Sequence, residues 1–371
     1  MVGEKKYGGD IYAMELARPA GIGQQLRVYA RPAWRARNPY PGMLADALVA
    51  QGVPVSELSY SWHPVPGEKK AILFFHWPDE FFFARNPRQQ LRTLLLLANL
   101  WWGRVVRRQK IVWLAHNVLP HERNGRPFGF ARRGFFAALD GLIFLSAPSR
   151  DLLLAAYPAL ADQPWLVIPH GHYQGRVATP PSLPRVYPAG PVHLAFIGRV
   201  KRYKAPDLLA STVQDLPPST ARLVIAGYCT DADLTAELRQ AAASAGNIHL
   251  QLEYLSDAEI ERITDEADAV VLPYRDIVNS GSALLALSRF RPVIAPRLGS
   301  LIELQGQVGE DWLWLYDGPL TGERMREGIE WVRNTQRISP PDLSAQDWTH
   351  IGEKLARFLR QIAHEPGSGI P

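Results

Sequence analysis

Basic side chains gather behind one predicted strand in the second half of the chain. The strand at 193–197 is followed by Gly198 and Arg199, and Tyr203 and Lys204 come next in the same turn. Glycine lets a ligand approach the backbone, and an arginine fork or a lysine charge suits phosphate oxygens. The cluster therefore predicts a phosphate site, with a solvated basic turn as the alternative.

A second phosphate signal lies where the chain passes from a strand at 269–272 into a helix. Asn279 or Ser280 would cap this helix. The amides of Ser280, Gly281 and Ser282 would then point outward at its positive end. An ordinary capped helix would give the same sequence. Because both signals follow strands of one predicted sheet, together they indicate a diphosphate site.

Histidines and carboxylates gather at predicted strand ends in the first half of the chain. After strands that end at residues 75, 115 and 168 come His76, Trp77, Asp79, His116, His121, Glu122, His170 and His172. Such clusters can bind metals, but these spacings match no helical His-x3-His or comparable signature. We therefore expect no metal cofactor. Taken singly, each histidine could equally be a hydrogen-bonded packing residue.

Short apolar runs alternate with helical patterns along the whole chain. Strands are predicted at 26–30, 71–75, 111–115, 141–145, 165–168, 193–197, 223–226, 248–252, 269–272 and 292–295. Helices are predicted at 41–51, 87–108, 149–157, 206–214, 230–243, 257–266, 280–288 and 347–364. This βαβ alternation implies an α/β fold with parallel sheets covered on both faces. Open sheets of this kind bind ligands in the crevice at the carboxyl ends of their strands.

The proline-rich stretch at 179–191 indicates a linker between two doubly wound domains. We expect residues 1–180 to form the first domain, with 1–25 as an extension of uncertain role. Residues 190–345 are expected to form the second domain. The C-terminal helix within 346–371 would pack back toward the first.

The composition narrows the class of protein. The 371 residues are 47% hydrophobic and 21% charged, enough for two packed cores and incompatible with wholesale disorder. A single cysteine, Cys229, fits a reducing compartment, and a net charge of +5 suits an anionic partner. Residues 1–25 lack the apolar run of a signal peptide. The composition predicts a cytoplasmic protein that can attach to a membrane surface.

The motifs of the second half together resemble the nucleotide-sugar-binding domain of the GT-B glycosyltransferases, a fold of two Rossmann-like domains facing a central cleft. The resemblance implies a donor-binding set consisting of Gly198, Arg199, Tyr203, Lys204, Gly227, Tyr254, Tyr274, Asn279, Ser280, Gly281 and Ser282. Tyr254 would lie beside the base of the nucleotide. Retaining GT-B families carry a Glu-x7-Glu pair at this helix start, where the present chain has Asn279 and Leu287. The retaining assignment is therefore in doubt.

From about Asn38 to the last helix, the motif set resembles the β-mannosyltransferase family of xanthan-type exopolysaccharide assembly. This resemblance implies an inverting transfer of mannose from GDP-mannose to an oligosaccharide on a polyprenyl diphosphate, without a metal. Inversion needs a base for the acceptor hydroxyl; Asp79 or Glu122 is the candidate, with His116 or His121 as runner-up. The acceptor side of the cleft would include Asn38, Tyr40, His76, Trp77, His170 and His172.

A basic and aromatic stretch at 81–121 contains no Asp or Glu. Its arginines and tryptophans suit an interfacial helix on an anionic bilayer, although a buried helix with arginine ends would share the pattern. The predicted membrane contacts are Arg92, Trp101, Trp102, Arg104, Arg107 and Arg108. A lipid-linked acceptor would make such contact useful and would place the protein on the inner face of the bacterial cytoplasmic membrane.

Three other interpretations fit parts of the pattern. The chain could use a different nucleotide sugar, because no residue specifies mannose directly. It could be a basic nucleic-acid-binding protein, although it lacks a known nucleic-acid motif. It could also be a non-catalytic partner protein with a decayed site.

Overall fold

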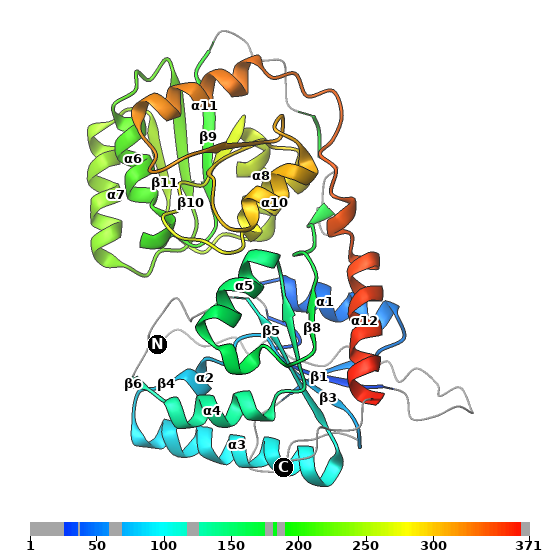
Figure 1. The fold of residues 1–371 in the computed structure, drawn as a ribbon. Coiled ribbons are helices and arrows are strands. Elements are labelled where there is room, and N and C mark those ends of the chain that lie inside the picture. Colours follow the sequence, from blue (N-terminus) through cyan, green and yellow to red (C-terminus); the bar gives the residue numbers. More distant parts are fainter. Residues whose placement is uncertain are drawn as a thin grey trace, which may run out of the picture.

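The computed structural model describes residues 26–35, 38–58, 69–116, 126–174, 181–183 and 190–364. Within them, two parallel sheets of six strands stand one above the other, each flanked by helices (Figure 1). The first sheet has the strand order β2-β1-β3-β5-β7-β8, and the second β11-β10-β9-β12-β13-β14. The doubly wound α/β architecture predicted from the sequence is confirmed.

The first sheet consists of β1 Val28–Arg31, β2 Val55–Glu57, β3 Ile72–Phe75, β5 Lys110–Ala115, β7 Gly141–Phe144 and β8 Trp165–Val167. A small antiparallel pair beside it is formed by β4 Phe83–Ala84 and β6 Arg126–Pro127. The second sheet consists of β9 Val192–Ile197, β10 Ala221–Ala226, β11 Ile248–Gln251, β12 Ala269–Val271, β13 Val293–Pro296 and β14 Leu313–Tyr316. The central strands are buried along their length, as parallel strands covered on both faces must be.

The helices of the first half are α1 Tyr40–Ala50, α2 Asp79–Phe82, α3 Pro87–Arg107, α4 Gly129–Ala138 and α5 Ala147–Ala156. The later helices are α6 Pro206–Gln214, α7 Ala232–Ser244, α8 Asp257–Glu266, α9 Gly281–Ser288, α10 Ser300–Val308, α11 Gly322–Asn334 and α12 Trp348–His364. Short 3-10 turns lie at Pro158–Leu160, Arg202–Lys204 and Ser344–Gln346.

Strand order places the functional loops. In each sheet the order reverses beside the first strand, between β1 and β3 and between β9 and β12. Loops leaving such a switch point in opposite directions open a crevice. The carboxyl ends of the two sheets face one another (Figure 1), so the two crevices meet between the domains.

The last helix returns to the first domain. Ile351, Leu355, Leu359 and Ile362 of α12 are buried in one cluster with residues of β1, β3, β5 and α1. Helices α1 and α12 pack so closely that a Cβ on Gly352 would lie 2.6 Å from the carbonyl oxygen of Ala47. The chain therefore enters the second domain after β8 and leaves it again before α12 (Figure 1).

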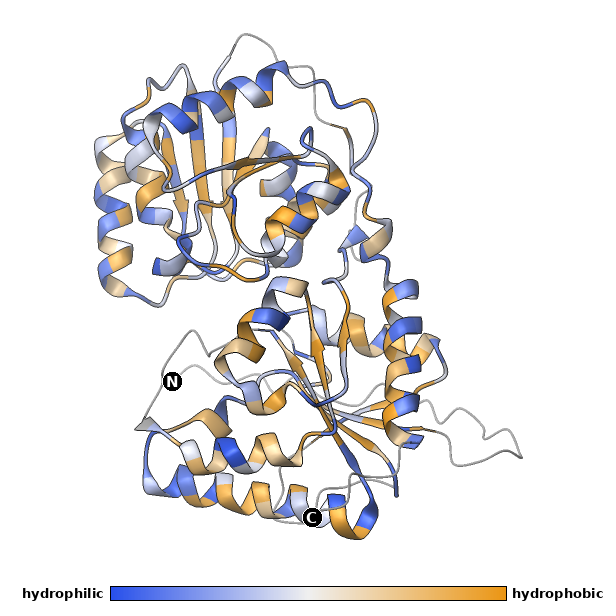
Figure 2. Cartoon of the chain, in the orientation of Figure 1, coloured by the Kyte–Doolittle hydropathy of each residue, from blue (hydrophilic) through white to orange (hydrophobic). Residues whose placement is uncertain are grey.

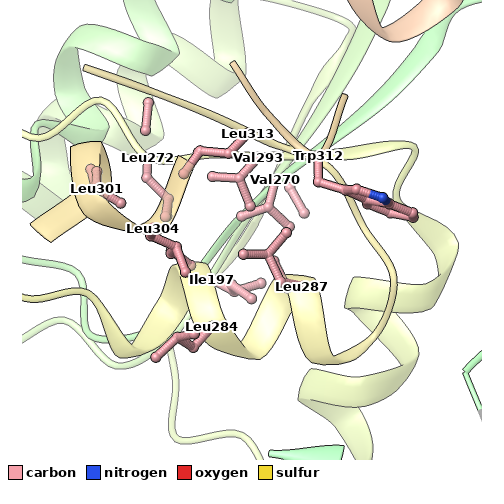
Figure 3. Packing of buried hydrophobic residues seen from close by; sticks show 14 of the residues in the cluster. Ile197, Val270, Leu272, Leu284, Leu287, Val293, Leu301, Leu304, Trp312 and Leu313 are labelled. Carbon is pink, nitrogen blue, oxygen red and sulfur yellow. The ribbon is translucent and has the colours of Figure 1, made fainter. Parts of the chain in front are cut away.

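Helix α9 is anchored in the core of the second domain. Leu284 and Leu287 pack against Ile197, Val270 and neighbouring apolar side chains, as Figure 3 shows. Burial of this face fixes the helix, so its N-terminal turn is held at a constant position relative to the ends of β9 and β12.

Several elements were absent from the sequence prediction. The strand pattern does not predict the edge strands β2 and β14, and the helical pattern does not predict α4, α10 or α11. Strand β2 has only three residues, too few for a period-two pattern. Helix α4 contains Gly134, a weak helix former, whose missing side chain leaves room for Leu97 of α3 (a Cβ there would lie 2.6 Å from Leu97 Cδ2).

Candidate active site

Two glycines form the floor of the site in the second domain. Gly198 follows β9 with φ +109°, and Gly227 follows β10 with φ +138°. A Cβ on Gly227 would lie 1.9 Å from the carbonyl oxygen of Gly198, and a Cβ on Gly198 would lie 2.7 Å from Ser282 Oγ. The two strand ends and the start of α9 therefore approach to distances that only glycine permits.

Lys204 projects its ammonium group into this glycine-lined region. Its Nζ would lie 3.5 Å from a Cβ on Gly198 and lies 5.7 Å from the ring centroid of Tyr274. Burial, together with the nearby positive charge of Arg199, lowers the pKa of Lys204 to about 8. Among the described residues Lys204 has no ion pair with a carboxylate. A desolvated cation beside an exposed arginine would be neutralised by an anionic ligand.

The start of α9 is capped by Ser280. Its Oγ accepts a hydrogen bond from the Ala283 amide at 3.1 Å and lies 3.1 Å from the hydroxyl of Tyr274. Burial raises the pKa of Tyr274 to about 12, so its phenol stays neutral. The cap leaves the first amides of α9 directed toward the same region as Lys204.

Asn279 does not cap the helix, because Ser280 occupies the N-cap position. Its Nδ2 donates a hydrogen bond of 3.2 Å to the carbonyl oxygen of His116 in the first domain. One hydrogen of its amide is thus used in an interdomain contact, and the prediction that Asn279 binds the donor stays a prediction.

Two other predicted donor-side tyrosines lie at the rim. Tyr254 follows β11 and is 51% exposed, and its predicted place beside the nucleotide base stays a prediction. Tyr203 is half-buried in the 3-10 turn, and its carbonyl oxygen accepts a hydrogen bond from the Arg275 amide at 2.9 Å.

Two histidines of the first domain form a pair. His76 Nδ1 and His116 Nε2 lie 3.1 Å apart in a hydrogen bond whose direction depends on the tautomers. Trp77 stacks on His116 with a centroid separation of 4.4 Å. The guanidinium of Arg35 lies over the Trp77 ring, 5.5 Å from its centroid. Burial lowers the pKa of His76 to about 3 and that of His116 well below its ordinary value. Both rings are therefore neutral at physiological pH, and the lowered pKa makes His116 a weak proton acceptor.

A third histidine lies against the start of α9. A Cβ on Gly281 would be 3.3 Å from the Tyr173 hydroxyl and 3.5 Å from His170 Nε2. Burial lowers the pKa of His170 to about 4, and its Nδ1 lies 2.9 Å from the carbonyl oxygen of Gly171. Tyr40 packs on His170 with a centroid separation of 4.3 Å. The structure thus brings Tyr40, His170 and the donor-side helix together.

Two predicted cleft residues have structural roles. Asn38 Oδ1 accepts a hydrogen bond of 3.2 Å from the Tyr40 amide at the start of α1. His172 Nε2 lies 3.7 Å from Asp347 Oδ2, and the His172 carbonyl oxygen accepts a 2.7 Å hydrogen bond from Trp348 Nε1. These contacts fix α1 and α12 rather than leave the side chains free for a substrate.

Of the residues predicted as the base, the structure describes Asp79 and not Glu122 or His121. Asp79 is exposed in the first turn of α2, whereas Glu122 and His121 lie outside the described residues. Glu80, which the sequence interpretation passed over, is half-buried and lies 3.5 Å from Arg31. Burial raises its pKa, partly opposed by Arg31. Its position directly after Asp79 in the sequence was the signal that could have identified it as a candidate base.

Within the described residues, no group of three or more His, Cys, Asp or Glu side chains could hold a metal ion. None of the described helices combines the length and apolar character needed to cross a bilayer.

The predicted membrane residues divide between two faces of α3. Trp101 donates to the Gly134 carbonyl oxygen at 3.3 Å, and Arg104 donates to the Ala138 carbonyl oxygen at 3.0 Å and pairs with buried Asp140. These two therefore face α4 and the protein interior, which corrects their assignment as lipid contacts. Trp102, 39% exposed, remains on the outer face with the guanidinium of Arg107 over its ring at 4.8 Å. Arg92 and Arg108 are exposed.

Comparison with known proteins places this geometry in context. Residues 191–318 match the family described as glycosyl transferases group 1. A GDP-mannose:glycolipid 4-beta-D-mannosyltransferase of Xanthomonas campestris pv. campestris is 29% identical over 343 residues, 89% of this chain and 90% of the relative.

Solved structures of similar fold cover most of the chain. Anabaena HepE in complex with UDP aligns with a TM-score of 0.59 at 14% identity, over 91% of this chain and 100% of that one. Sucrose-phosphate synthase of Thermosynechococcus elongatus aligns with a TM-score of 0.60 at 15% identity, over 91% and 99%. Two facing doubly wound domains, the second of them matching the group 1 family, identify this chain as a glycosyltransferase of the GT-B fold related to the β-mannosyltransferases.

Proposed function

We propose that this protein is an inverting, metal-independent β-mannosyltransferase. It transfers mannose from GDP-mannose to an oligosaccharide on a polyprenyl diphosphate, in exopolysaccharide synthesis at the inner face of the bacterial cytoplasmic membrane. The observation that carries the proposal is the glycine-lined, cationic region at the start of α9, in a chain related over 89% of its length to an enzyme named for this donor and acceptor class.

The donor side supplies stabilisation of the leaving group. Lys204, Arg199 and the amides of the first turn of α9 converge on the place where Gly198 and Gly227 permit close approach. As the bond from the anomeric carbon to the diphosphate breaks, negative charge builds up on the diphosphate oxygens. Fixed cations and helix amides stabilise that charge without a metal ion.

The acceptor side supplies the proton acceptor. The acceptor hydroxyl loses its proton to a carboxylate, its oxygen bonds to the anomeric carbon from the opposite face, and GDP leaves. Asp79 and Glu122 are the proposed bases from the sequence, and Glu80 joins them on the structure. A raised pKa improves a carboxylate as a proton acceptor, which favours a direct comparison of Glu80 with its neighbour.

The donor can be tested by calorimetric titration of GDP, GDP-mannose, UDP and UDP-glucose, with and without EDTA. Selective binding of the guanosine ligands that EDTA does not change is expected. Binding of only the uridine ligands would retain a glycosyltransferase but remove mannose, and binding of none would remove the proposed function. Arg199→Ala is expected to weaken donor binding and turnover together.

The base can be tested by comparing Asp79→Asn, Glu80→Gln and Glu122→Gln. The true base should lose about 10²- to 10⁴-fold in kcat while keeping the affinity for GDP-mannose. The product anomer, read by nuclear magnetic resonance, tests inversion independently. Full activity in all three variants would refute a carboxylate base from these loops.

Membrane attachment is proposed through the outer face of α3. Leu91, Leu95, Trp102, Val105 and Val106 are 39–63% exposed. Their spacings of four, eleven, fourteen and fifteen residues place them on one side of the helix. Figure 2 shows this helix at the edge of the first domain with hydrophobic and hydrophilic segments alternating along it. An apolar stripe on the outside of a helix, flanked by the exposed Arg88, Arg92 and Arg108, suits insertion into the headgroup region of an anionic bilayer.

The membrane contact can be tested by sedimentation with phosphatidylglycerol and phosphatidylcholine vesicles. Leu91→Ser, Leu95→Ser and Val105→Ser combined should abolish binding to the anionic vesicles, since each exposed side chain contributes about 1 kcal/mol or more when buried. The matched control replaces Ile302 and Ile338, exposed on the second domain, by serine. Equal vesicle binding by both variants would refute the α3 surface.

A further inference from the structure

Asn279 links the donor side of the cleft to the acceptor side. Its Nδ2 donates to the His116 carbonyl oxygen at 3.2 Å, across 163 positions of sequence. Ser280, the next residue, caps α9, and Ser282 Oγ lies beside Gly198 in the proposed diphosphate region. One side chain therefore joins the two surfaces that must act on the same bond.

His116 is held at both of its ends. Its ring is fixed by the hydrogen bond to His76 and by the stack on Trp77, whereas its carbonyl group is fixed from the second domain by Asn279. The carbonyl belongs to the residue that directly follows β5. The orientation of its peptide is therefore set by a residue of the donor domain.

We propose that Asn279 is a positioning residue that holds the His116 peptide in register with the bound donor, and that this position requires an amide donor rather than a carboxylate. The inference rests on the proposed transferase function for its kinetic consequence. The hydrogen bond itself stands independently of that function.

The chemistry of the contact explains the requirement. The partner of Asn279 is a carbonyl oxygen, which can only accept a hydrogen bond. A carboxylate at 279, as in retaining GT-B enzymes, has no hydrogen to donate and would place two acceptors face to face at about the same separation. The amide found here satisfies the carbonyl and keeps the two domains together at this point.

Other contacts keep the domains apposed when this one is removed. The Tyr173 amide donates to Ser288 Oγ at 2.9 Å, and His170 and Tyr173 lie against Gly281. Removal of the Asn279 amide should therefore alter the register of the His116 peptide without separating the domains or changing the diphosphate region. This predicts a defect in turnover and not in donor affinity.

The experiment measures donor affinity by calorimetry and kcat and acceptor KM by a steady-state assay, for Asn279→Ala, Asn279→Asp and Asn279→Gln. The Ala variant should lose about tenfold in kcat, matching loss of one hydrogen bond. The Asp variant should lose more, and the Gln variant, which keeps the amide, should recover part of the loss. The Kd for GDP-mannose should stay within about twofold of the native value in all three. Asn334→Asp, exposed at the end of α11, controls for the added charge.

The outcomes separate this inference from the proposed function. If the native protein turns over and all three variants match it, the inference fails and the transferase stands. If Asn279→Ala weakens donor binding as Arg199→Ala does, Asn279 is a donor ligand and the inference fails. If the native protein binds no nucleotide sugar, the proposed function fails. Hydrogen exchange at the end of β5 then tests the contact alone: faster exchange in Asn279→Ala supports it, and unchanged exchange refutes it.

Discussion

The lowered pKa of Lys204 predicts that donor affinity depends on pH. A phosphate site needs the charged ammonium, and burial lowers its pKa from 10.5 to about 8. About 90% of the protein carries the charge at pH 7 and about 10% at pH 9. The affinity for GDP should therefore fall about tenfold between these values, because the terminal phosphate, with a second pKa of about 6, is already mostly ionised at pH 7.

The same group makes the opposite contribution to stability. In the unfolded chain Lys204 keeps its proton up to its ordinary pKa of 10.5, so between pH 8 and 10.5 the unfolded state binds more protons than the native state. Stability from this group therefore rises with pH across that window and is lowest below pH 8. One pH unit corresponds to about 1.4 kcal/mol. After allowance for the partial exposure of the side chain, charged Lys204 lowers the free energy of unfolding at pH 7 by about 1–3 kcal/mol.

Lys204→Met should consequently raise the free energy of unfolding at pH 7 by about 1–2 kcal/mol and abolish GDP binding. Lys204→Arg keeps its charge at every pH used, so it should bind GDP with little dependence on pH. Lys354→Met, exposed on α12, controls for loss of a lysine. Urea denaturation and calorimetry from pH 6.5 to 9.5 measure both quantities. A native protein whose GDP affinity is flat across pH 8, or a Met variant that unfolds more easily, would refute the assignment.

Two further predictions follow from single side chains. Gly227→Ala places a Cβ at 1.9 Å from the Gly198 carbonyl oxygen on a backbone with φ +138°, so it should lose donor binding and about 2 kcal/mol or more of stability. Gly246→Ala, with nothing within 4 Å, should change neither, and equal behaviour of the two in thermal unfolding and calorimetry would contradict the close approach. His76, neutral in the fold with its pKa lowered to about 3, binds a proton in the unfolded state below pH 6.5. Stability is therefore lost as pH falls, by about 2 kcal/mol from this residue at pH 5, and a His76→Gln variant whose acid sensitivity matches the native protein would refute that contribution.

Much of the fold can be predicted from the spacing of apolar residues and from the residues that begin and end helices. Helices α6 and α8 begin and end where their caps and apolar spacing predict, because Pro206 and the Ser256 capping box specify their starts locally. Edge strand β14 was missed although its residues are mostly buried. Its burial comes from packing against α10 and α11, which short-range patterns do not record.

The site was predictable only in part, for a related reason. Strand-end reasoning brings His76, His116 and His170 to one edge because parallel strands share an edge. It does not tell which residues cross between domains. Asn279 is predicted to bind the donor from its place beside the cap, and its contact with the His116 carbonyl oxygen depends on the relative placement of the two sheets, which local patterns do not record. Trp348 reaches His172 only because α12 returns to the first domain.

The return of α12 has a consequence for the synthesis of the protein. Its apolar residues complete the core of the first domain, yet about 180 residues of chain separate β8 from α12. A ribosome adding about 5 to 20 residues per second needs about 10 to 35 s to cover that distance. During this time the second domain, whose strands and helices are contiguous in the chain, can close, while one face of the first sheet lacks the part of its cover that α12 supplies. The core of the earlier-made domain can therefore be completed only after the later-made domain has been synthesised, and its apolar face stays exposed on the nascent chain until then.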